Sequence, residues 1–295
     1  MPRPAVGSSL VTKLNADNIS EVSDLLVAEE PMEIRLGYGS ENNRRQKSIS
    51  VTMRTPGNDF ELALGFLFTE GIIRNPGDVS FVKYCTELNR FGNHENIVRV
   101  ELDSSIDVDL KKLERHFYTS SSCGVCGKAS IDSIEINEVF IADDLDLTVD
   151  SEILTRLTGK IKSRQNVFEY TGGLHAAALF NNAGELISIR EDVGRHNALD
   201  KLIGATFSSH QLPLNQHLLL LSGRASFELI QKAAMAGIKI IAAIGAPSTL
   251  AVETAKKFKI TLIGFLREDR FNIYSGKDRI IIAAGKRTAE KILQK

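Results

Sequence analysis

Residues 121–128, SSCGVCGK, contain two of the three cysteines of the chain. Cys123 and Cys126 are separated by two residues and flanked by Ser and Gly, which is typical of an exposed loop. The nearby Lys128 favours the thiolate form of a cysteine, and a thiolate attacks the sulfur of a disulfide or persulfide as well as carbon. The pattern therefore favours a nucleophilic thiol that exchanges sulfur.

Three other interpretations of this cysteine pair stay open. A structural zinc site needs about four ligands, whereas the pair supplies two, and neither Cys85 nor the histidines complete a zinc-finger spacing. A thioredoxin-like redox pair follows a strand at the start of a helix rather than sitting in a Ser/Gly loop. An inert buried pair usually has apolar neighbours. That last description fits Cys85, in VKYCTEL, better than the pair, and we expect Cys85 to be a packing residue.

A second group of candidate residues follows apolar runs in the C-terminal half. These runs alternate with helical patterns as β-α-β-α-β, and their continuous Leu and Ile content predicts a parallel sheet covered on both faces. Ligands of such sheets bind outside the carboxyl ends of the strands, where helix N-termini and arginines hold anions. We therefore expect a pocket for phosphates or a nucleotide. Strands are expected at 217–221, 238–244 and 260–265, and helices at 224–236 and 248–258. The three strands lead into the loops SGRAS (222–226), GAPST (245–249) and LREDR (266–270). These loops supply Arg224, Arg267 and Arg270.

The segment EDVGRHNALDK, residues 191–201, concentrates polar residues where a strand passes into a helix. One interpretation is an ordinary helix start capped by Asp192 or Asn197. The other is a polar wall of the binding cleft, with Arg195 and with His196 able to bind a ligand or move protons. His175, which enters an apolar strand in TGGLHAAALF, is more simply explained as a core histidine.

The order of elements predicts an α/β fold in the C-terminal domain, preceded by a smaller strand-rich domain. The chain as a whole is therefore expected to be of the α+β class. Residues 1–118 have alternating strand patterns at 32–39 and 47–54 and a helix that begins with Asp59 as its cap. Residues 119–130 are the Ser/Gly loop that carries the cysteine pair and joins the two domains. Residues 131–295 form the α/β domain, in which LISIRED pairs with the strand before it across the turn NNAG.

The bulk composition limits the class of partner. The 295 residues carry a net charge of −1, so no basic field attracts nucleic acid, and an anionic ligand needs a local cluster of cations. The N-terminus has no apolar export signal, and no apolar run is long enough to cross a bilayer. We therefore expect a cytoplasmic protein without membrane insertion, in which cysteines are reduced.

A set of long motifs closely resembles one family. The motifs, in order, are MRTPGNDFELALGFLFTEGII, SSCGVCGK, TGGLHAAALF, EDVGRHNALDK, SGRASFELIQKA, GAPSTLAVE and GFLREDRFNIY. They resemble the formate dehydrogenase accessory sulfurtransferase family, FdhD, from about residue 50 to residue 275.

This resemblance implies a sulfurtransferase and its partners. Members take persulfide sulfur from a cysteine desulfurase and pass it to the molybdenum or tungsten bis-guanine-dinucleotide cofactor of formate dehydrogenase. A guanine nucleotide is then a partial mimic of the bound substrate. The resemblance also implies a homodimer and a C-terminal cytidine-deaminase-like domain of three layers.

The resemblance also places the site residues. The C-x-x-C of the family falls on Cys123, expected to carry the persulfide, and on Cys126, and its cofactor segment falls on Phe265, Leu266, Arg267, Glu268, Asp269 and Arg270. From the strand-end argument we add Arg224 and Ser226 to the cofactor pocket, and we assign no protein-bound metal.

Two alternative functions compete with the sulfur carrier. In the first alternative the chain is a chaperone that only holds the cofactor. In the second it is a zinc-dependent nucleotide hydrolase of deaminase type. Zinc deaminases carry H-x-E followed by P-C-x-x-C. Here the cysteines come first, and His175 is followed by Ala176 and Ala177, so the catalytic Glu is absent. We therefore expect a deaminase-like scaffold without deaminase activity.

Overall fold

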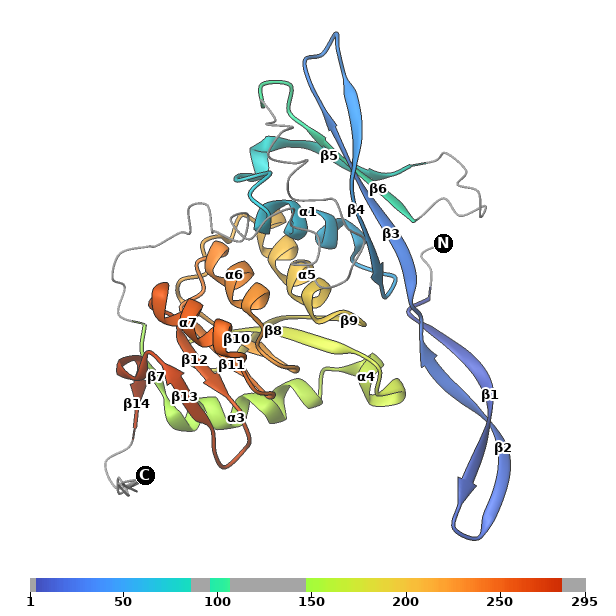
Figure 1. The fold of residues 1–295 in the computed structure, drawn as a ribbon, viewed down its shortest axis with the longest axis vertical. Helices are drawn as coiled ribbons and strands as arrows, with labels where there is room; N and C mark the ends of the chain where they lie inside the picture. Colours follow the sequence, from blue (N-terminus) through green and yellow to red (C-terminus); the bar gives the residue numbers. More distant parts are fainter. Residues whose placement is uncertain (1–3, 86–95, 107–146, 283–295) are drawn as a thin grey trace.

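The computed structural model describes residues 4–85, 96–106 and 147–282 (Figure 1). The cysteine pair, and with it the junction expected at residues 119–130, lies outside these ranges. Among the described residues no helix is long and apolar enough to cross a membrane.

A six-stranded sheet forms the centre of the C-terminal half. Its spatial order is β13-β12-β11-β10-β8-β9. The neighbours β10, β11 and β12 run parallel, as their continuous apolar runs predicted, whereas β8, β9 and β13 are antiparallel to their neighbours. The strands are β8 (His175–Asn181), β9 (Leu186–Asp192), β10 (His217–Leu221), β11 (Ile240–Ala243), β12 (Thr261–Gly264) and β13 (Asn272–Ser275).

Helices cover both faces of this sheet, which confirms the three-layer expectation (Figure 1). Side chains of alternate strand positions enter two different hydrophobic cores because strand residues alternate in direction. Leu219 and Ile241 belong to the core beneath the helices α5, α6 and α7, and Leu218 and Ile240 belong to the core beneath α3. The helices are α3 (Ser151–Lys162), α4 (Asn166–Thr171), α5 (Arg195–Ser208), α6 (Phe227–Met235) and α7 (Thr249–Lys257).

The N-terminal half adds a second sheet and one helix. The sheet has the order β4-β3-β6-β5, and one of its faces packs on α1, whose apolar residues enter the same core as α5 and α6. The N-terminal strands therefore share a hydrophobic core with the C-terminal helices. The elements are β3 (Glu30–Tyr38), β4 (Arg45–Arg54), α1 (Asp59–Thr69), β5 (Val79–Tyr84) and β6 (Ile97–Leu102).

A long hairpin that the sequence did not reveal projects from this body (Figure 1). It consists of β1 (Val6–Asn15) and β2 (Asn18–Val27), paired antiparallel along their whole length. Leu10, Leu14 and Ile19 are about two-thirds or more exposed on it, at 69%, 76% and 68%. Since neither face is fully buried, the polar and apolar residues lack the clean alternation that signals a strand.

Short elements complete the described chain. The first of them directly precedes β5, and the short strands β7 and β14 pair in parallel with each other. They are η1 (Pro76–Asp78), β7 (Val149–Asp150), η4 (Lys277–Arg279) and β14 (Ile280–Ile281).

One predicted helix cap is wrong. Asn58, in a left-handed conformation, precedes α1, and Asp59 is the first helical residue. The Asp59 carboxylate instead pairs with the guanidinium of Arg54, at 2.8 Å and 3.0 Å, and both side chains are buried. The carboxylate is therefore used to neutralise a buried cation rather than to cap the helix.

Candidate functional site

The three strand-end loops lie together, tied by backbone hydrogen bonds. The amides of Gly245 and Phe265 donate to the carbonyls of Gly223 and Gly245, at 3.0 Å and 3.1 Å. The amide of Ala225 donates to Ala246 at 3.2 Å, and that of Ser248 donates back to Ala225 at 3.0 Å. The carboxyl ends of β10, β11 and β12 thus carry one connected backbone surface, as expected for an α/β ligand site.

This surface depends on tight or unusual backbone. A β-carbon on Gly245 would lie 2.9 Å from the Cα and N of Arg224, so only glycine permits the two loops to approach. Phe265 has φ 53°, a left-handed conformation that a bulky residue rarely adopts. The residue is 42% exposed. Strained residues of this kind cluster at ligand sites.

The predicted cofactor segment divides into several environments. Arg267 donates through Nη1 to the carbonyls of Ile244 and Leu266, at 2.8 Å and 2.7 Å, and so holds its own loop. Leu266 is fully buried in the core beneath α3, which leaves only its backbone near the surface.

The acidic residues of the segment and its last arginine are exposed. Glu268 pairs with Lys162 at 3.5 Å, and Asp269 pairs with Arg270 at 3.5 Å, in both cases between highly exposed side chains. Exposed pairs of this kind bind weakly, so the Arg270 guanidinium can turn to an anion at little cost.

Four basic side chains gather beside the 222–226 loop. The pKa of His175 is lowered by burial first, and then by the charges of Arg195, His196 and Arg224, while Asp192 acts in the opposite sense. Arg224 belongs to this loop, and His196 contacts Ser226 at its end. The β-carbon that Gly223 lacks would lie 3.1 Å from Nδ1 of His175. His175 is half-buried at the edge of this loop, and the prediction of a core histidine is wrong.

His196 contacts two side chains at the start of α6, the N-cap Ser226 and Glu228. Its Nε2 lies 3.2 Å from Oγ of Ser226 and 3.8 Å from Oε2 of Glu228. Burial opposes ionisation of Glu228, but His196, the backbone amide and Ser226 outweigh it and lower the pKa of this carboxyl to about 2. The site therefore contains a fixed negative charge beside the imidazole of His196.

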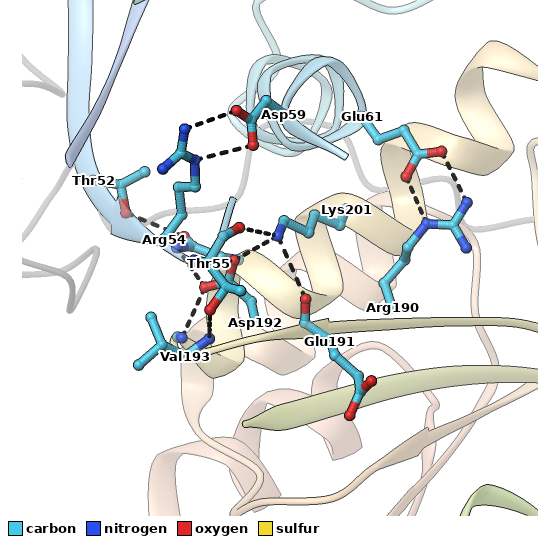
Figure 2. A network of polar contacts seen from close by, with 12 residues as sticks. Thr52, Arg54, Thr55, Asp59, Glu61, Arg190, Glu191, Asp192, Val193 and Lys201 are labelled. Carbon is cyan, nitrogen blue, oxygen red and sulfur yellow. Dashed lines mark hydrogen bonds and ion pairs between the residues drawn. The ribbon is translucent and has the colours of Figure 1, made fainter. Parts of the chain in front are cut away.

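The turn that carries Arg195 and His196 is anchored by Asp192. Its carboxylate is fully buried and accepts hydrogen bonds from the amides of Thr55 (3.1 Å) and Gly194 (2.8 Å) and from Nδ2 of Asn197 (3.0 Å). It also pairs with Nζ of Lys201 at 2.7 Å (Figure 2). Gly194 is the N-cap of α5, so the expectation of an Asp192 or Asn197 cap is wrong. The side chains of Asp192 and Asn197 are hydrogen-bonded to each other, and Asn197 also donates to the carbonyl of Met53 in β4.

Several of these residues were not singled out from the sequence. Glu228 lies within SGRASFELIQKA, and Lys201 ends EDVGRHNALDK, but neither was assigned a role. The signal for Lys201 was available, because a lysine beside Asp200 interrupts the apolar positions Ala198, Leu199, Leu202 and Ile203 of the helix. Cys85 is buried, as predicted. No cluster of three or more metal-ligating side chains occurs within the described ranges.

Comparisons with known proteins agree with this architecture. The model of the FdhD/NarQ family matches residues 27–281. The protein named sulfur carrier protein FdhD from Streptomyces coelicolor is 47% identical over 276 residues, covering 93% of this chain and 95% of the relative. Its namesake from Mycolicibacterium paratuberculosis is 48% identical, covering 92% and 97%.

A solved structure supports the fold. The crystal structure of a candidate formate dehydrogenase accessory protein from Desulfotalea psychrophila has a TM-score of 0.70 and 22% identity. The match covers 94% of this chain and 100% of that one, so it includes both sheets and not only the C-terminal layers.

Proposed function

The chain belongs to the FdhD/NarQ family, and we propose that it is a sulfur carrier, a sulfurtransferase that serves formate dehydrogenase. The observation that carries the proposal is the near-half identity, over almost the whole chain, with relatives named sulfur carrier protein. The donor is a cysteine desulfurase. The acceptor is the molybdenum or tungsten bis-guanine-dinucleotide cofactor, bound here as a substrate.

The first chemical step is a thiol exchange at Cys123. Its thiolate attacks the outer sulfur of the donor persulfide, the sulfur–sulfur bond of the donor breaks, and the donor leaves as a thiolate. Cys123 then holds the outer sulfur as its own persulfide. Bond formation and bond cleavage balance, so this step needs no external oxidant or reductant.

The second step uses Cys126. Its thiolate attacks the inner sulfur, a Cys123–Cys126 disulfide forms, and the outer sulfur leaves as sulfide for the metal. The two electrons on the sulfide come from the two cysteines, which become oxidised to the disulfide. A dithiol reductant restores both thiols before the next cycle.

The strand-end loops supply the pocket for the guanine dinucleotide. Its pyrophosphates suit a site with several arginines on an otherwise nearly neutral chain. Arg224 and Arg270 are exposed and lie within the loops 222–226 and 266–270. Ser226 is the N-cap of α6, and the partly exposed Phe265 is available for stacking on a base. Arg267, Glu268, Asp269 and the backbone of Leu266 shape the loop around them. A guanine nucleotide alone should therefore bind as a partial mimic.

The proposal also implies the cellular compartment in which the reaction takes place. A persulfide carrier needs free thiols, and the reducing cytoplasm provides them. We infer a homodimer there that meets the desulfurase and formate dehydrogenase in turn.

Complementation tests the proposal in cells. In cells without their own copy, the wild-type chain should restore formate dehydrogenase activity, whereas Cys123→Ala should not. Cys85→Ala is the matched control, because this cysteine is buried and serves packing. Full activity with Cys123→Ala would leave a chaperone that only binds the cofactor as the better account.

A further inference from the structure

Two buried Lys–Asp ion pairs each have one partner on α5, and we propose that one of them, Asp192–Lys201, positions the proposed pocket. It fixes the turn at residues 192–197 against the end of β4 and thereby orients Arg195 and His196 towards the 222–226 loop. The inference rests on the proposed function, since it concerns the pocket for the guanine dinucleotide.

The geometry of Lys201 ties three elements together. Lys201 is 1% exposed, and its ammonium reaches Asp192 at the end of β9, the carbonyl of Thr55 at 2.8 Å and the carbonyl of Glu191 at 3.4 Å. An ammonium has three N–H donors, so each has an acceptor. The lysine therefore holds the end of β9 and the residue after β4 against α5 (Figure 2).

The turn itself is attached to β4 at further points. The amide of Val193 donates to Oγ1 of Thr55 at 3.2 Å. The Asn197 amide group donates to the carbonyl of Met53 at 2.7 Å, and its oxygen accepts from Thr52 at 3.2 Å. The N-terminal sheet therefore sets the position of a turn whose function lies in the C-terminal layers.

The residues between these anchors are the ones that lie beside the 222–226 loop. His196 contacts Ser226 and Glu228 across the site. Arg195 lies within electrostatic reach of His175. Its Nε is buried and has no hydrogen-bond partner among the described residues. A buried donor in this state is stabilised when a ligand supplies an acceptor.

The second ion pair provides a matched control. Lys232 of α6 donates to both oxygens of Asp200 at 2.9 Å and to Thr69 at 2.8 Å, and both charged residues are buried. This pair joins α5, α6 and the end of α1 and makes none of the described contacts to the turn. Removing one partner of either pair deprives a buried charge of its nearest counter-charge, although Lys232 keeps Glu70 at 3.8 Å. Both losses therefore destabilise the fold, but only one should disturb the pocket.

The experiment compares Lys201→Met and Asp192→Asn with Lys232→Met and Asp200→Asn in the full chain. GDP binding is measured by calorimetry below the melting transition of each variant, and the histidine side chains are titrated by NMR. We expect GDP to bind about tenfold more weakly to the first two variants and within about twofold of wild type to the last two. Asp192→Asn should also lower the pKa of His175 further, because Asp192 raises it. Asp200→Asn should not.

Equal losses of GDP affinity in both pairs, or none in either, would overturn the positioning role. If wild type itself fails to bind GDP, the proposed pocket is wrong, and the positioning role is then judged on the His175 and His196 resonances alone. If the charge variants do not fold, Thr55→Val replaces them. It removes only the side-chain acceptor for Val193, and it should weaken GDP binding by about threefold.

Discussion

Gly65 of α1 and Gly204 of α5 lie against each other where the two helices cross. A β-carbon on Gly65 would lie 1.8 Å from the carbonyl oxygen of Asp200 and 2.8 Å from the amide of Gly204. A β-carbon on Gly204 would lie 1.8 Å from the carbonyl oxygen of Glu61. The backbones are therefore in direct contact, and this contact joins the N-terminal sheet to the helix that carries Arg195 and His196.

Gly204→Ala should destabilise the fold by about 3 kcal/mol or more, because backbone on both helices must move apart. The same change at Gly159, exposed in α3 with open space around it, should stabilise the fold by about 0.5–1 kcal/mol. Urea unfolding of the two variants measures the contrast. Similar effects at both positions would mean that the helices do not cross as described.

Asp59→Ala should cost about 3–5 kcal/mol, because among the described residues it leaves the buried Arg54 guanidinium with only the more distant Glu30 carboxylate, at 3.4 Å. The exposed pair Arg156–Glu152 on α3 provides the comparison. Arg156→Ala should change the free energy of unfolding by no more than about 0.5 kcal/mol. A loss near this smaller value for Asp59→Ala would show that water reaches Arg54.

Glu228 should make the free energy of unfolding depend on pH in the acid range. Its folded pKa of about 2 lies below the ordinary value of 4.5, so its ionised form stabilises the fold above pH 4.5, and this contribution is lost as the pH falls towards 2. Since the Glu228 side chain is partly exposed, screening by solvent reduces the effect to about 1 kcal/mol. The difference in unfolding free energy between wild type and Glu228→Gln should therefore shrink from pH 6 to pH 3. A constant difference would mean that the carboxyl is not held ionised.

His175 should report ligand binding. Burial and three neighbouring cations keep its pKa low. Phosphates placed among those cations would neutralise them, so GDP should raise the pKa of His175 in an NMR titration. His210, exposed just after the end of α5, is the control residue in the same spectra. A pKa of His175 that stays constant in saturating GDP would place the phosphates elsewhere.

Much of the fold followed from local pattern. Continuous apolar runs predicted the parallel order of β10, β11 and β12, and the strand ends predicted where the loops would meet. Asp150 caps α3, because its side chain accepts a hydrogen bond from the backbone amide of Glu152, two residues along the chain. In these cases the physical cause lies within a few residues of sequence.

The missed features depend on contacts between distant residues. Lys201 and Asp192 meet Thr55 across 146 and 137 positions of sequence, so no local spacing connects them. Asp59 was misassigned as a cap because Arg54 competes for its carboxylate. The β1–β2 hairpin lacks a buried face and therefore lacks a periodic signal.

The central claim is that Cys123 carries sulfur, and intact-protein mass spectrometry tests it most directly. The chain is mixed with a cysteine desulfurase and cysteine, and the measurement is repeated for Cys123→Ala, Cys126→Ala and Cys85→Ala. We predict a gain of the mass of one sulfur that a reductant removes, absent from Cys123→Ala and retained in the other two variants. A gain that persists in Cys123→Ala, or no gain in wild type while the desulfurase is active, would contradict the sulfur-carrier account.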